Sequence, residues 1–132
     1  MIGKINHLGI AVKSLAEAEK QWGPALGLKK IGEETVAEQK VKVAMFKVGE
    51  SKVELLEPTA PDGAIGKFLA NRGEGIHHVC FQVDDIKQAI ADLKAKGAPL
   101  IDQEPRLGAG GHKVAFIHPK GFNGVLVELL ED

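Results

Sequence analysis

The sequence predicts an α+β fold in which two βαβββ repeats form one curved, mixed sheet. Three observations predict it. A strand-like run with His in its third place and Val five residues after that His occurs twice, at residues 5–12 and 76–83. A helical pattern follows each run, and each repeat ends on Val-Glu-Leu-Leu-Glu, at 53–57 and 127–131. Internal repetition of this kind indicates two copies of one supersecondary unit.

The first repeat is expected at residues 4–57. Its opening strand leads into a helix from Leu15 to Leu26, because apolar residues recur there at helical spacing. Ser14 can act as the N-cap of this helix, and Gly27 can close it. Extended segments bounded by turn residues then follow, at roughly 28–38, 41–48 and 52–57.

The second repeat is expected at residues 76–131 and has the same order of elements. Asp84 or Asp85 can cap its helix, and Gly97 can close it. The apolar positions of this helix again share one face, and they are Ile86, Ala89, Ile90 and Leu93. The extended segments of this repeat are expected at roughly 99–104, 112–118 and 125–130.

A connector at residues 58–75 joins the repeats and carries a short helical pattern, 65–72, closed by Gly73. One repeat has too few residues to bury a good core alone. We therefore expect residues 1–132 to form a single domain in which repeats pair. The sequence leaves open whether they pair within one chain or between two chains.

The composition argues against several classes of partner. Lys and Arg number 17 against 18 Asp and Glu, so no charge excess favours nucleic acid or an anionic membrane. Arg72 and Arg106 are the only arginines. Cys80 is the only cysteine, which excludes an internal disulfide and a thiolate zinc cluster, and its apolar neighbours predict burial. No apolar stretch approaches the ~20 residues of a membrane span, and no secretory signal is evident, so a cytoplasmic location is expected.

Two histidines and two glutamates occupy matched places in the repeats. Side chains alternate between the two faces of a strand, so His7 and His78 each share a face with every second residue of their strands. Glu54 and Glu128 alternate with apolar neighbours, and each should point away from the hydrophobic face. If a pseudo-two-fold axis relates the repeats, these four side chains can converge near it.

Two imidazoles and two carboxylates would form a mixed nitrogen and oxygen site. Such donors suit divalent cobalt, manganese, nickel, zinc or magnesium, of which we take cobalt first. About two positions of an octahedron would stay open for a substrate, which Lewis-acid catalysis requires. The sequence thus predicts that the sheet surrounds a metal site held by His7, Glu54, His78 and Glu128.

Taken singly, each of these residues has an ordinary structural explanation. A lone His in an apolar strand is more often structural, and a lone Glu at a strand end is usually solvated. Their recurrence at matched places in both repeats favours the metal site. His77 should face the opposite side from His78 and be structural or exposed, and Glu57 and Glu131 are expected to be solvated.

A glycine-rich run, residues 108–111, includes Gly108, Gly110 and Gly111. Backbone N–H groups in such a run can approach an anion closely, which would suit substrate binding. The alternative is a plain hairpin loop. The run alone does not decide between them.

The chain resembles the methylmalonyl-CoA epimerases of the vicinal-oxygen-chelate superfamily along nearly its whole length. The resemblance lies in five segments of the sequence. They are Asn6-His7, Val53 to Pro58, Gly75-Ile76-His77-His78, Asp102 to Gly111, and His118-Pro119-Lys120 followed by Gly124 to Leu129.

The resemblance implies that His7, Glu54, His78 and Glu128 are metal ligands and that Glu128 is also a catalytic acid/base. It implies the interconversion of the two epimers of methylmalonyl-CoA by loss of the α-proton through a metal-stabilised enolate, with a CoA thioester as substrate and a homodimer as assembly. Lys120 and the glycine run would contact the substrate. Some bacterial members carry a second acid, a glutamate, in the third strand, where this chain has Val43.

Two other functions stay open on the same scaffold. A glyoxalase-like metalloenzyme would act on glutathione adducts, but such enzymes recruit arginines for the glutathione carboxylates and this chain has two. A metal-free protein that binds a small molecule would not need four ligands retained. The metal content of the protein discriminates between the last possibility and the enzymes.

Overall fold

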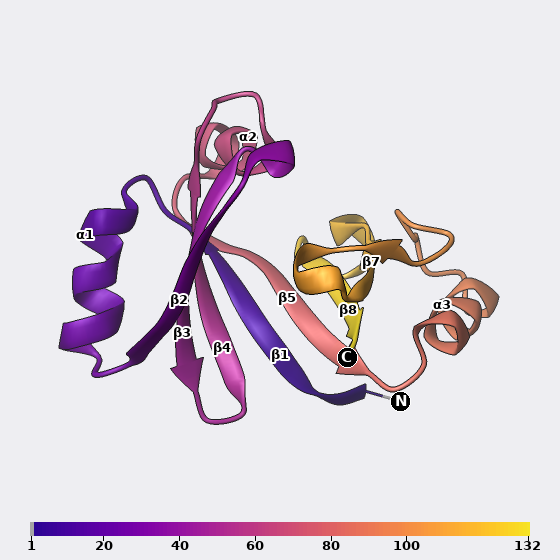
Figure 1. Ribbon diagram of the computed structural model, residues 1–132. Helices are drawn as coiled ribbons and strands as arrows, with labels where there is room; N and C mark the ends of the chain where they lie inside the picture. Colours follow the sequence, from indigo (N-terminus) through magenta and orange to yellow (C-terminus); the bar gives the residue numbers. More distant parts are fainter. Residues whose placement is uncertain (1) are drawn as a thin grey trace. The chain divides into compact units, whose positions relative to one another are not determined.

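The structure, a computed structural model, describes residues 2–132 and falls into two compact units. One unit joins the chain up to Asn6 with His78–Asp132, and the other is His7–His77. Strand β1 (Ile2–Ala11) runs from the first unit into the second. Along the chain the elements read β-α-β-β-β twice, with one further helix between the two series, which confirms the predicted repeats (Figure 1).

In the unit His7–His77 the strands lie in the order β2-β3-β4-β1. Strand β4 pairs in parallel with β1, and the other two pairings are antiparallel. These strands agree closely with the predicted segments and are β2 (Lys29–Val36), β3 (Val41–Val48) and β4 (Ser51–Pro58). A short 3-10 turn, η2 (Ala37–Gln39), joins β2 to β3, and α2 (Ala64–Arg72) follows β4.

The helix predicted at 15–26 is divided into two parts. Helix α1 (Leu15–Lys20) begins at Ser14, whose hydroxyl accepts the Glu17 backbone N–H at 3.2 Å, as predicted. It widens into a π-helical segment, η1 (Gln21–Ala25), that contains Pro24. Proline has no N–H and its ring crowds the preceding turn, so a regular α-helix cannot continue through it.

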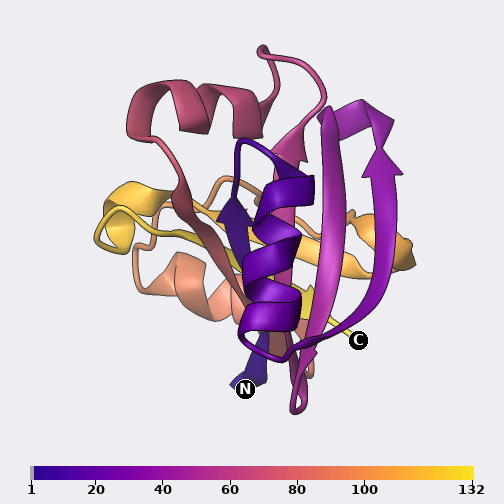
Figure 2. The same cartoon turned by 90° about the vertical axis from the view of Figure 1, so that its left-hand side faces the viewer.

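Both faces of this sheet are apolar. Helix α1 lies along β3 and β4 and covers one face (Figure 2). The residues buried on that side include Ile10, Val12, Leu15, Ala18, Phe46, Val53 and Leu55. The other face carries a second buried group, to which α2 contributes Ile65 and the strands contribute Ala11, Val41, Val43 and Leu56. Glu54 alternates with Val53 and Leu55, which are buried on the α1 side, and Leu56 shares the face of Glu54, so that face is apolar as well.

In the other unit the order is β5-β8-β7-β6, and the start of β1 lies next to β5. Strands β5 and β8 pair in parallel, and the other two pairings are antiparallel. The elements are β5 (Gly75–Val83), α3 (Ile86–Ala95), β6 (Arg106–Leu107), η3 (Ala109–Gly111), β7 (Lys113–Ile117), η4 (Pro119–Gly121) and β8 (Leu126–Glu131). Asp85 caps α3 by accepting the Gln88 backbone N–H at 3.1 Å. Helix α3 packs on β7 and β8 through the apolar face that the sequence predicted.

The strand predicted at 99–104 is absent from the described chain, and this prediction was wrong. Only Leu100 bridges to Ile117, and the ladder resumes at β6 with two residues. The reason lies in Asp102, whose carboxylate accepts the Phe116 backbone N–H at 2.8 Å. A side chain thus occupies the donor that a strand carbonyl would take, and Pro99 and Pro105 at either side have no N–H to give.

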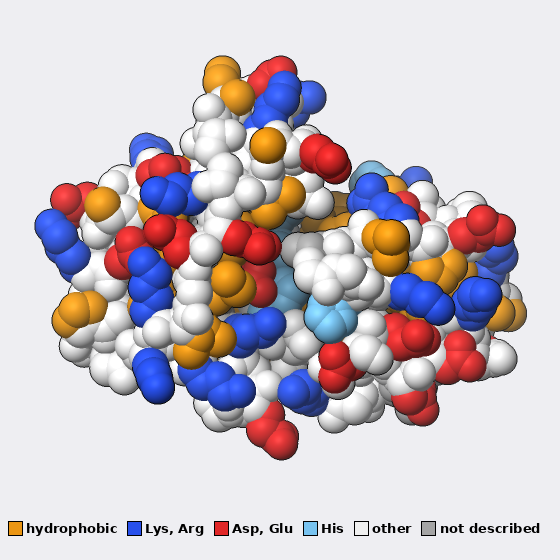
Figure 3. All heavy atoms as spheres, viewed as in Figure 1, with side chains coloured by type: hydrophobic (Ala, Val, Ile, Leu, Met, Phe, Trp, Pro, Cys, Tyr) orange, Lys and Arg blue, Asp and Glu red, His pale blue; other side chains and the backbone are white. Residues whose placement is uncertain are grey.

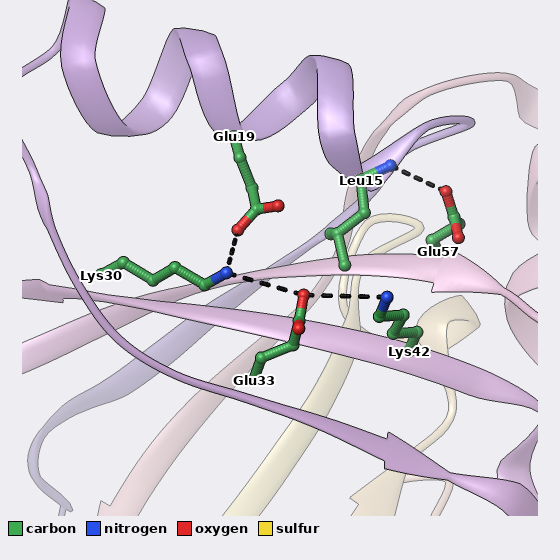
Figure 4. A network of polar contacts seen from close by, with 6 residues as sticks. All are labelled: Leu15, Glu19, Lys30, Glu33, Lys42 and Glu57. Carbon is green, nitrogen blue, oxygen red and sulfur yellow. Dashed lines mark hydrogen bonds and ion pairs between the residues drawn. The ribbon is translucent and has the colours of Figure 1, made fainter.

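Glu57 and Glu131 hold the helices, so the prediction that they are solvated was wrong. Glu57 accepts the backbone N–H of Leu15 at 2.8 Å, at the first residue of α1 (Figure 4). Glu131 accepts the backbone N–H of Ile86 at 2.9 Å, at the first residue of α3. A carboxylate at a helix N-terminus satisfies an open donor and stabilises the helix dipole. Each repeat therefore ties the end of its last strand to the start of its helix.

Charged side chains of both signs are interspersed over the visible face of the molecule (Figure 3). Lys30 contacts Glu19 and Glu33, and Lys42 also approaches Glu33 (Figure 4). The hydrogen bond to Glu19 raises the pKa of Lys30 above its ordinary value. Between residues 2 and 132, no helix has the length and apolar character that crossing a membrane requires.

Candidate functional site

The unit His7–His77 holds one of the predicted histidine–glutamate pairs. His7 lies on β1 and Glu54 on the neighbouring parallel strand β4, and His7 Nδ1 is 3.5 Å from Glu54 Oε2. In the strand register Glu54 stands beside Gly9, two residues after His7, so both side chains leave the same face. Their side chains are 7% and 16% exposed, respectively.

The other unit holds the second pair in the same arrangement. His78 lies on β5 and Glu128 on the parallel strand β8, with His78 Nε2 at 3.4 Å from Glu128 Oε1. Glu128 stands beside Cys80, again two residues after the histidine. The two strand pairs therefore present the same residue types at the same register. Cys80 is fully buried, as predicted.

The donor atoms of each pair suit a shared divalent ion. Two donors that each bind one ion at about 2.0–2.2 Å lie roughly 3.0–3.5 Å apart, depending on the coordination geometry. The 3.4 and 3.5 Å separations fall within this range. A carboxylate with little exposure also costs free energy unless a positive charge or hydrogen bonds compensate it. Each pair thus has the donor types and the spacing that half of a mixed nitrogen and oxygen metal site requires.

The predicted glycine loop is a hydrogen-bonded turn. The Gly108 backbone N–H donates to the His112 carbonyl at 2.8 Å, and the Gly111 N–H donates to the Gly108 carbonyl at 3.2 Å. A Cβ on Gly108 would meet Val114 Cγ1 at 2.9 Å, so the close approach to β7 requires glycine there. Two of the three predicted backbone donors are therefore engaged inside the loop.

Lys120 lies in η4 with an exposed side chain, and its backbone N–H donates to His118 Nδ1 at 3.0 Å. Segment η4 follows the last residue of β7, whereas the glycine loop precedes its first residue. Five residues of strand separate the two, on the order of 13 Å. Lys120 and the glycine loop therefore lie at opposite ends of β7.

The surroundings of Val43 and His77 argue against an acid/base or ligand role for either residue. Val43 is 6% exposed within the apolar group that α2 covers, so the place where some relatives carry an acid is hydrophobic here. His77 packs edge-on against the Phe68 ring, with ring centres 5.1 Å apart, which agrees with the first of the two predicted alternatives, a structural or an exposed residue.

One arrangement near Glu128 was missed at the level of sequence. Arg106 Nε lies 3.4 Å from Asp102 Oδ2, and the guanidinium carbon lies 5.0 Å from the centre of the Phe116 ring. Phe116 is the strand partner of Glu128. The four-residue spacing of Asp102 and Arg106 was visible in the sequence, but only the β7 register connects it with Glu128.

Comparison with known proteins identifies the family. Residues 6–116 match the model of the Glyoxalase/Bleomycin resistance protein/Dioxygenase superfamily. The uncharacterized protein YqjC of Bacillus subtilis is 43% identical over 98% of this chain and 93% of its own. The ethylmalonyl-CoA/methylmalonyl-CoA epimerase of Cereibacter sphaeroides is 41% identical over 98% of both chains.

The solved structures agree with this assignment. A methylmalonyl-CoA epimerase in complex with methylmalonyl-CoA and NH4+ superimposes with a TM-score of 0.92 and 38% identity, over 100% of this chain and 96% of that one. The match covers both repeats and both histidine–glutamate pairs. The chain belongs to the glyoxalase/bleomycin resistance protein/dioxygenase superfamily, with the vicinal-oxygen-chelate fold, and within it to the methylmalonyl-CoA epimerase family of isomerases.

Proposed function

We propose that this chain is a metal-dependent epimerase that interconverts (R)- and (S)-methylmalonyl-CoA. The observation that carries the proposal is the histidine–glutamate pair at the same strand register in both units. The names of relatives that are about 40% identical over nearly the whole chain support the substrate. A small CoA thioester is thus the proposed partner, and a cytoplasmic homodimer remains our expectation for the assembly.

In the proposed site His7, Glu54, His78 and Glu128 together hold one divalent ion. Cobalt is our first choice, with manganese, nickel, zinc or magnesium as alternatives. When bound, the ion supplies Lewis-acid stabilisation of the negative charge that develops on the thioester oxygen. The low exposure of the four side chains keeps water away, which strengthens every charge interaction there.

Glu128 is the proposed acid/base that removes the α-proton. Its carboxylate is 11% exposed and has Phe116 as its strand partner, so few water molecules compete for the proton. Epimerisation also needs a group that returns a proton on the opposite face. Val43 cannot do this, so a water molecule or another side chain takes that role. The exposed Lys120 and the loop of Gly108, Gly110 and Gly111 remain our candidates for contacts to the CoA moiety.

Deuterium exchange tests the reaction. Methylmalonyl-CoA in D2O should gain deuterium at its α-carbon with the metal-loaded protein, and a metal-stripped sample should be at least ~100-fold slower. The variant Glu128→Gln should lose this exchange. Glu131→Gln is the matched control, since it lies three residues further on β8 and contacts α3 instead. Exchange that persists in Glu128→Ala removes Glu128 from catalysis, and no exchange by the loaded wild type rejects the epimerase.

Calorimetric titration with Co²⁺ tests the shared ion. One ion per chain is expected, with affinity reduced at least ~10-fold by Glu54→Gln and by Glu128→Gln alike. Two independent ions per chain, each lost with one of the two pairs, would reject the shared site. If no divalent ion binds or restores activity, a metal-free binding protein is the better interpretation. Turnover of a glutathione adduct instead of methylmalonyl-CoA would favour the glyoxalase-like alternative.

A further inference from the structure

Arg106 is held in a fixed place by two contacts within its own unit. Its Nε approaches Asp102 Oδ2 at 3.4 Å, and its guanidinium lies over the Phe116 ring at 5.0 Å from the ring centre. Asp102 is itself anchored, because the same carboxylate oxygen accepts the Phe116 backbone N–H at 2.8 Å. Since Asp102 is only 15% exposed, this support is largely shielded from water.

The strand register places Arg106 on the same face as Glu128. Arg106 pairs with Val114 across β6 and β7, and Val114 pairs with Leu130 across β7 and β8. Directly paired residues and residues two apart share a face, so Glu128 and Phe116 belong to this face too. Phe116 is the strand partner of Glu128, so the guanidinium over the Phe116 ring lies on the same face of the sheet as the proposed base.

The Arg106 guanidinium remains accessible to a ligand. Its side chain remains 58% exposed although it is oriented by Asp102 and stacked on an aromatic ring. A guanidinium oriented in this way presents a fork of donors that matches an oxyanion. The equivalent place in the other repeat, opposite Val43, holds Glu34, so the positive charge is specific to this half of the chain.

We propose that Arg106 is a substrate-binding residue that contacts an oxyanion of the acyl-CoA beside Glu128. This rests on the proposed function and extends it, because it says which residue orients the substrate. Two oxyanions of the substrate have this chemistry: the carboxylate of the acyl group and the phosphates of CoA. Both bind a guanidinium through paired hydrogen bonds.

Direct binding provides the main test, so that the result does not depend on turnover. Calorimetry with methylmalonyl-CoA should show an affinity about 10- to 100-fold lower for Arg106→Met than for the wild type, the usual effect of losing a charged hydrogen-bond pair. Arg106→Lys should lie between them. Arg72→Met is the matched control, because Arg72 also lies over a phenylalanine ring, 5.7 Å from the centre of Phe68, but in the other unit, and its affinity should stay within twofold.

A substrate without the nucleotide separates the two oxyanions. Methylmalonyl-pantetheine keeps the acyl carboxylate and lacks the phosphates. The same relative loss in Arg106→Met assigns the contact to the carboxylate, and no loss assigns it to the phosphates; both results support the proposal. Equal affinities of wild type and Arg106→Met for methylmalonyl-CoA, with unchanged thermal unfolding, overturn it. If the wild type binds methylmalonyl-CoA without exchanging its α-proton, the epimerase proposal is rejected, and the binding data still decide the role of Arg106.

Discussion

The last strand of each repeat carries two glutamates that we assign to different tasks. Glu54 and Glu128 face a histidine, whereas Glu57 and Glu131 hold the first backbone N–H of a helix. We predict that glutamine at either helix-holding position lowers the stability of the protein and leaves metal affinity within twofold. Glutamine at either histidine-facing position should lower the metal affinity and leave the stability of the metal-free protein nearly unchanged.

The magnitude follows from the type of bond that is weakened. Glutamine keeps an acceptor oxygen for the helix N–H but removes the negative charge, which costs about 1 kcal/mol for a partly buried carboxylate at a helix N-terminus. For 132 residues, an unfolding entropy of roughly 2.1 cal/mol/K per residue converts this into a Tm about 3–4 °C lower. Glu57→Gln and Glu131→Gln lie in different units, so the double variant should lose roughly the sum.

Thermal unfolding of the metal-free protein and Co²⁺ titration of the same four variants provide the measurement. A Tm within 1 °C of wild type for both Glu57→Gln and Glu131→Gln would show that these bonds contribute nothing. A metal affinity that falls as far in Glu131→Gln as in Glu128→Gln would refute the division of tasks. Glu34→Gln, on an exposed position of β2, controls for the general effect of removing one negative charge.

Three further predictions follow from packing and charge. Gly108→Ala should cost about 1–3 kcal/mol in urea unfolding because its Cβ would meet Val114 Cγ1 at 2.9 Å, and this cost should be smaller when it is measured in a Val114→Ala background. Val43→Glu should destabilise the protein by roughly 2–4 kcal/mol at pH 8 and by less at pH 5, because Val43 is buried. Burial raises the pKa of the introduced carboxyl in the folded state, so a rise in pH favours the unfolded state, in which the carboxyl is ionised. Equal losses of stability at both pH values would contradict this. Lys30→Met should lower stability by less than about 1 kcal/mol, an effect abolished by 1 M NaCl. Because the pKa of Lys30 is raised, that contribution is complete at neutral pH and lost only as pH rises through the folded pKa, above 10.5.

The repeat itself made most of the fold predictable. Strand positions in the first repeat, the caps Ser14 and Asp85, and the burial of Cys80 all followed from local patterns. The strand predicted at 99–104 was wrong because the Asp102 carboxylate takes the place of a strand as the partner of β7. A side chain that accepts a backbone hydrogen bond produces no periodic pattern in the sequence. The prediction that Glu57 and Glu131 are solvated was wrong for a related reason, since their partners are backbone N–H donors of helices more than 40 residues away in the sequence.

The candidate site was predictable only as far as the two repeats are alike. The histidine–glutamate pairs have equivalents in both halves, and comparison of the halves found them. Arg106 has no such equivalent, because the matching residue of β2 is Glu34. A substrate with distinct ends nevertheless needs an asymmetric site, since a scaffold with two equal halves would bind it in either direction. The opposite charges at Glu34 and Arg106 would supply that asymmetry next to histidine–glutamate pairs that match in the two halves. In the function we propose, the residues in which the halves differ orient the substrate, and the residues that the halves share hold the metal ion.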